Sequence, residues 1–218
     1  MARPPGQRPF PAVVILHGTH GFAREYVTLA TDLARAGVIG IAACWFSPGS
    51  GVGMHYVTPI GCPGAPPLPK PDDASALDRV DALLDAVATL PGVKAEKVGL
   101  FGHSRGAGLA LSYALARKKA HAVVLDSGGY PGALPAGAAE RAAPLLILHG
   151  TADRPDDGGS AVTAVAKARA FEAAVTRAGG RVEAKYYAGA GHNALFTDPV
   201  QNQDEVERVK AFLARAFK

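Results

Sequence analysis

We predict an α/β protein in which helices cover both faces of a mostly parallel sheet of about six strands, giving a three-layer α/β/α sandwich. Two observations support this fold class. Short apolar runs alternate along the chain with segments of helical character. Most of the runs are apolar throughout, which is typical of strands that are covered on both faces. With 218 residues and no interdomain linker, the chain is expected to form one domain, residues 1–218.

The expected strands are of two kinds. Five are continuous apolar runs, at residues 12–16, 38–43, 98–101, 122–125 and 145–148. The sixth, at residues 182–187, alternates apolar residues with Glu183 and Lys185. This alternation predicts an edge strand with one face in water.

Helices are expected between these strands, at residues 25–36, 73–90, 107–116, 162–178 and 204–217. Gly37, Pro91 and Gly179 directly follow three of these segments, and glycine and proline are typical helix terminators. We expect the apolar stripes of the helices to pack on the sheet.

One stretch, residues 45–71, is too long for an ordinary connection and is rich in glycine and proline. It follows the carboxyl end of a strand, where open α/β sheets bind ligands. We therefore expect a substrate-pocket wall with Trp45, Phe46, His55 and Tyr56 as its lining. The alternative is a surface loop with its own packing. The stretch 130–143 is rich in small residues and receives no assignment.

Composition excludes several classes of partner. The net charge of +4 is modest and its basic residues are scattered, so we expect no nucleic-acid partner. No apolar run reaches about 18 residues, so no membrane partner is expected.

Residues 1–10 lack the apolar core of a secretory signal, which favours the cytoplasm, with a longer secreted precursor as the alternative. Cys44 and Cys62 are expected to be free thiols, and a disulfide between them is the rival interpretation.

The most informative motif is Gly-His-Ser-Arg-Gly at residues 102–106. It follows an expected strand and precedes an expected helix, and this order exposes a serine nucleophile above a parallel sheet. Side chains at Gly102 and Gly106 would collide with neighbouring chain in such a tight turn. We therefore predict that Ser104 is a nucleophile.

A serine hydroxyl needs a base, and the base needs an orienting group. His192 is the best base, because it lies in a glycine-rich turn just past the last strand. Asp153 is the best orienting residue by its position after the strand at 145–148, with Asp156 and Asp157 as competitors. Because all three candidates follow strand ends, they are expected to meet at one edge of the sheet.

Acyl transfer also requires donors for the developing oxyanion. The backbone N–H of Arg105 is one candidate. We assign the other to Thr19, in the turn after the first strand, with His20 as the rival and as a residue that could touch substrate. Clustered metal ligands and a phosphate-binding loop are not found in the sequence, so neither a metal nor a cofactor is expected.

The motifs together resemble the α/β-hydrolase superfamily and, within it, the dienelactone hydrolase family. The resemblance rests on His17-Gly18, residues 102–106, residues 149–153 and Gly191-His192. It implies hydrolysis of carboxylic esters or small lactones, a small-molecule substrate, through an acyl-enzyme. Founding dienelactone hydrolases use a cysteine nucleophile, whereas this chain has Ser104, which points toward ordinary esters.

The resemblance leaves two points open: the start of the sheet and the type of function. The antiparallel strands that usually begin this fold are expected to be reduced or missing, which would leave a sheet edge open to association, and a homodimer is one expectation. A serine peptidase on the same fold and a catalytically silent binding protein are the competing functions.

Overall fold

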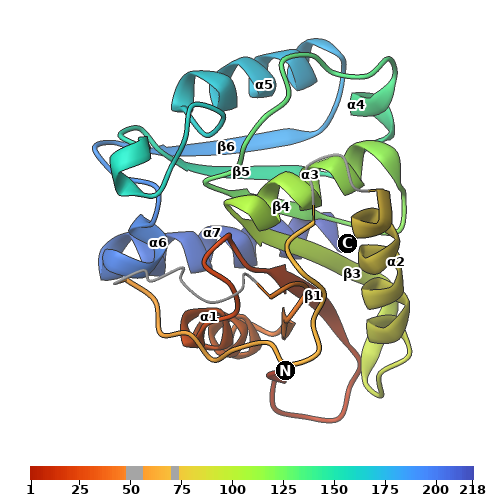
Figure 1. Cartoon of the computed structure of the whole chain (residues 1–218). Helices are drawn as coiled ribbons and strands as arrows, with labels where there is room; N and C mark the ends of the chain where they lie inside the picture. The colour runs from red at the N-terminus through yellow and green to blue at the C-terminus, as the bar shows by residue number, and fades with distance from the viewer. Residues whose placement is uncertain (48–55, 70–73) are drawn as a thin grey trace.

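The structure is a computed structural model that describes residues 1–47, 56–69 and 74–218. It confirms the predicted fold class. A six-stranded sheet has the strand order β2-β1-β3-β4-β5-β6, and each neighbouring pair is parallel. Helices lie on both sides of this sheet (Figure 1).

The strands are β1 (Phe10–Leu16), β2 (Ile39–Ala43), β3 (Val93–His103), β4 (Val123–Asp126), β5 (Leu145–Gly150) and β6 (Val182–Tyr187). The helices are α1 (Arg24–Arg35), α2 (Ala74–Ala88), α3 (Arg105–Ala116), α4 (Ala138–Arg141), α5 (Val165–Arg177), α6 (Ala194–Thr197) and α7 (Pro199–Ala216), and a 3-10 turn spans Pro155–Asp157. The predicted strands and long helices are all present. The short helices α4 and α6 were not predicted.

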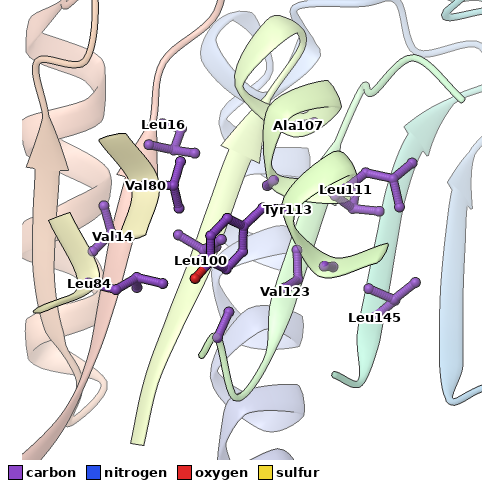
Figure 2. Close-up of a cluster of buried hydrophobic side chains, with 14 of the residues drawn as sticks. Val14, Leu16, Val80, Leu84, Leu100, Ala107, Leu111, Tyr113, Val123 and Leu145 are labelled. Carbon is purple, nitrogen blue, oxygen red and sulfur yellow. The ribbon is translucent and has the colours of Figure 1, made fainter. Parts of the chain in front are cut away.

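Two hydrophobic layers hold the helices to the sheet. On one face, α2, α3 and α5 pack on alternate strand residues such as Val14 and Leu100, and Figure 2 shows part of this layer. On the other face, α1 and α7 pack on the intervening residues, such as Val13 and Phe101. This arrangement explains why the central parts of the sheet are apolar: both of their faces are removed from water.

The two edges of the sheet differ. Among the described residues, β6 pairs only with β5, and it keeps partly exposed residues, as its alternating sequence predicts. At the opposite edge, the N-terminal segment touches β2 through one antiparallel bridge between Ala2 and Gly40. The described residues form no antiparallel strand before β1, in agreement with the predicted reduction of these strands.

Because all six strands run in one direction, their carboxyl ends form one edge of the sheet. The loops after β1, β3, β5 and β6 therefore leave from the same side, and the candidate site residues lie on these loops. Among the described residues, no helix is long and apolar enough to cross a membrane.

Candidate active site

Ser104 occupies the sharp turn between β3 and α3. Its φ of 54° lies in the left-handed region, which is unfavourable for a residue with a side chain. The turn is closed by two glycines. A Cβ atom at Gly102 would lie 2.3 Å from the carbonyl oxygen of Gly106, and one at Gly106 would lie 2.1 Å from that of Leu16. Only glycine fits at either position, so the local sequence dictates this tight geometry.

The structure brings together the three side chains that the sequence predicts to form a relay. His192 Nε2 lies 2.8 Å from Ser104 Oγ, and His192 Nδ1 lies 2.7 Å from Asp153 Oδ2. A proton on Nδ1 that is donated to the carboxylate leaves the lone pair of Nε2 directed at the serine hydroxyl. The arrangement can therefore remove a proton from Ser104.

Asp153 is held by more than the imidazole of His192. Thr163 Oγ1 donates to Asp153 Oδ1 at 2.8 Å, and His149 Nε2 lies 3.3 Å from Oδ2. Burial alone would raise the pKa of this carboxyl, but hydrogen bonds from His149, His192 and Thr163 outweigh that effect and lower it to about 2. Asp153 is thus ionised at neutral pH. Of its competitors, Asp156 is exposed, and the side chain of Asp157 lies outside the described residues.

The turn after β1 lies directly against Ser104. A Cβ atom at Gly18 would be 3.3 Å from Ser104 Cβ. The Gly18 N–H donates to Tyr26 Oη at 2.9 Å, so this amide already has an acceptor. The neighbouring Thr19 amide is the donor that the sequence predicts on this side. Arg105 begins α3, where the first amides of a helix have no acceptor within the helix.

His20, the rival for this role, is buried and held by Tyr26. Its Nε2 lies 2.7 Å from Tyr26 Oη, and the two rings stack with centroids 5.5 Å apart. Because Tyr26 Oη accepts from Gly18, its own proton is available for His20 Nε2, which leaves the His20 proton on Nδ1. Burial, and to a smaller extent the nearby His103, lower the pKa of His20 to about 3. The ring is therefore neutral at neutral pH.

The predicted pocket lining divides into three groups. Trp45 and Phe46 are buried in the hydrophobic core rather than exposed on a wall, and Trp45 Nε1 donates to the carbonyl oxygen of His17 at 3.1 Å. Tyr56 is partly buried and meets the His20 ring edge-on, with centroids 5.8 Å apart. His55 lies outside the described residues.

The segment 56–69 is attached to the start of α1 and to Arg105. It forms an isolated bridge between Ala23 and Pro59, and Arg105 Nη2 donates to the carbonyl oxygen of Pro69. A disulfide joins Cys44 to Cys62, so the expectation of free thiols was wrong and the rival interpretation holds. The chain returns Cys62 to the end of β2, and this tertiary contact could not be deduced from the spacing of the two cysteines.

Several residues at the site were given no role there by the sequence. Thr163 and His149 hold Asp153, Tyr26 holds the turn after β1, and Asn193 contacts His103. The position of His149 at a strand end was the one available signal. The described residues contain no group of three or more histidine, cysteine, aspartate or glutamate side chains that could hold a metal ion.

Comparison with known proteins agrees with this geometry. The sequence model of the Dienelactone hydrolase family matches residues 1–217. The chain belongs to the dienelactone hydrolase family. Membership over this length places it among hydrolases of the α/β-hydrolase superfamily. No curated protein sequence matches the chain.

Solved structures similar to this family member show the same fold. A proposed dienelactone hydrolase from Klebsiella pneumoniae has a TM-score of 0.75 at 20% identity, over 97% of this chain and 90% of that one. A dienelactone hydrolase-like promiscuous phosphotriesterase from metagenomic libraries has a TM-score of 0.70 at 19% identity, over 97% and 88%. Thermogutta terrifontis esterase 2 phosphorylated by paraoxon has a TM-score of 0.72 at 19% identity, over 98% and 86%.

Proposed function

We propose that the protein is a serine hydrolase that cleaves small carboxylic esters, lactones included, through an acyl-enzyme. The observation that carries this proposal is the continuous hydrogen-bonded chain from Ser104 through His192 to Asp153, at 2.8 Å and 2.7 Å. Nucleophile and base already lie within the distance that proton transfer requires. A catalytically silent binding protein would not need such an alignment.

In the first half of the reaction, Ser104 Oγ attacks the ester carbonyl carbon while His192 Nε2 takes the hydroxyl proton. The backbone amides of Thr19 and Arg105 stabilise the negative oxygen of the tetrahedral intermediate. When this intermediate collapses, the bond between the carbonyl carbon and the alkoxy oxygen breaks. His192 gives its proton to that oxygen, and the alcohol leaves.

In the second half, a water molecule attacks the acyl-enzyme and His192 takes one of its protons. Collapse of the second tetrahedral intermediate returns that proton to Ser104 Oγ and releases the carboxylic acid. Asp153, ionised because its pKa is lowered to about 2, stabilises the imidazolium in both halves. In a lactone the alcohol and the acid remain in one product.

The proposal is tested with Ser104→Ala and a panel of p-nitrophenyl esters of increasing acyl length, with a lactone and a peptide amide included. We expect Ser104→Ala to lose turnover, while Ser112→Ala, an exposed serine on the same helix, keeps it. Paraoxon phosphorylates one esterase of similar fold. We therefore expect one phosphoryl adduct by mass spectrometry, at Ser104. Full turnover by Ser104→Ala would refute the proposal.

A further inference from the structure

A second imidazole–carboxylate pair lies behind the relay and takes no part in the steps above. His103 Nδ1 is 2.5 Å from Asp126 Oδ2, and the two side chains are 0% and 2% exposed. The residues end the neighbouring strands β3 and β4 and are register partners in the sheet. The carbonyl oxygen of Asp126 also accepts the Ser104 N–H at 2.9 Å. One aspartate therefore fixes both His103 and the backbone of the nucleophile turn.

The other side of the His103 ring faces the loop that carries the catalytic base. His103 Nε2 lies 3.3 Å from Oδ1 of Asn193, the residue after His192. The His103 ring also contacts the rings of His192 and Phe196, with centroids 5.4 Å and 4.8 Å away. Thus His103 joins the turn of Ser104 to the loop of His192.

The loop of His192 leaves β6 through Gly189, which has a φ of 73°. On the β5 side, the Gly189 N–H donates to Thr151 Oγ1 at 2.8 Å, and the Ala190 carbonyl accepts from Ala152 at 2.9 Å. These bonds fix the start of the loop. His103 supplies a further contact, next to His192 itself.

Packing alone does not explain why the ionisable residues His103 and Asp126 are buried here. Burying ionisable groups is costly, and apolar side chains of similar volume would fill the same space at no such cost. In the observed geometry the carboxylate of Asp126 faces Nδ1 of His103, and Oδ1 of Asn193 faces Nε2. The imidazole thus offers two polar atoms at fixed angles, which is what a connection between two loops requires.

We propose that His103 is a positioning residue, held by Asp126, that keeps His192 aligned with Ser104 through the side chain of Asn193. This inference rests on the proposed function, since it assigns a role in the same reaction. Misplacing a reacting group by about 1 Å can cost on the order of 100-fold in rate. Loss of the link should therefore lower kcat and leave substrate affinity almost unchanged.

Two replacements of His103 distinguish the effect of losing the contact with Asn193 from the effect of changed packing. His103→Gln places its amide nitrogen near the position of Nε2 and keeps the donor to Asn193. His103→Asn places its nitrogen near Nδ1, so it keeps the bond to Asp126 and loses the link. Tyr113→Phe is the control, because it removes a partly buried 2.5 Å hydrogen bond from Tyr113 in α3 to Asp81 in α2, away from the site.

We expect Asn193→Ala and His103→Asn each to lower kcat for p-nitrophenyl acetate by about 10- to 100-fold, with KM changed less than about threefold. His103→Gln should retain more activity than His103→Asn, and Tyr113→Phe should keep the wild-type kcat. Thermal unfolding of every variant shows whether it is folded at the assay temperature.

The double variant His103→Asn with Asn193→Ala decides the mechanism. If the two residues act through one link, the double variant is no slower than the slower single variant. The rate of Ser104 labelling by a fluorophosphonate is measured in parallel, so the proposal can be judged even if no ester in the panel is turned over. An unchanged labelling rate in Asn193→Ala, or losses that multiply in the double variant, would overturn it.

Discussion

Replacing Asp153 with asparagine keeps the shape of the side chain and removes its charge and one acceptor. The carboxylate accepts from His192 at 2.7 Å and from Thr163 at 2.8 Å, and His149 lies 3.3 Å away. An amide NH2 group must then face at least one of these donors. Because His192 loses its orienting charge, we expect kcat for p-nitrophenyl acetate to fall by about 10⁴.

The same substitution has a calculable effect on stability. The pKa of Asp153 falls from 3.8 to about 2 on folding, which corresponds to about 2 kcal/mol of stability at neutral pH. Because the folded pKa is the lower one, this stabilisation is complete above the unfolded pKa and disappears as the pH falls through the folded pKa. About half of it should remain near pH 3.

Urea unfolding of the wild type and Asp153→Asn near pH 7 and near pH 3 measures the difference directly. The gap between the two proteins should narrow at the lower pH. Asp156→Asn, an exposed neighbour, is the matched control and should show neither effect. A gap of equal size at both pH values, or a variant with the wild-type kcat, would refute the reasoning.

Three further outcomes are expected from urea unfolding. Burial raises the pKa of Glu205 well above its usual value. The free energy of unfolding should therefore decline with rising pH above about 4.5, by at most about 1.4 kcal/mol per pH unit. Glu205→Gln should remove this slope. A slope that is the same in both proteins would contradict this. Reducing the Cys44–Cys62 disulfide, which spans 18 positions, should cost about 3 kcal/mol, whereas no change would mean that the bond constrains nothing. Tyr26→Phe leaves the Gly18 N–H without its acceptor and should cost about 1–3 kcal/mol, with wild-type stability as the contrary result.

The strands were predictable where an apolar sequence coincides with burial in the folded protein. β1, β4 and β5 are almost fully buried on both faces, and their sequences are mostly apolar. β3 begins five residues earlier than its apolar run, because Val93 pairs with Phe10 at the edge of the core. The residues Lys94, Glu96 and Lys97 in between hide this start from any apolar pattern. α4 and α6 have four residues each, too few to show a helical period.

The candidate site likewise contains residues that were predictable from the sequence and residues that were not. Ser104, Asp153 and His192 were predictable, because each follows a strand and parallel strands deliver their ends to one side. The supporting residues were not, since their partners are distant in the chain: His103 and Asn193 are separated by 90 positions. The disulfide was mispredicted for the same reason. Its formation depends on where the stretch after β2 returns, and the two cysteines alone do not encode that.

The left-handed backbone of Ser104 has an evolutionary and practical consequence. Glycine adopts this conformation without penalty, so Ser104→Gly would relieve the strain and give a more heat-resistant, inert protein. Directed-evolution libraries that are ranked by thermal stability alone would therefore enrich inactive variants at position 104. Only a screen that couples survival to turnover would preserve the serine.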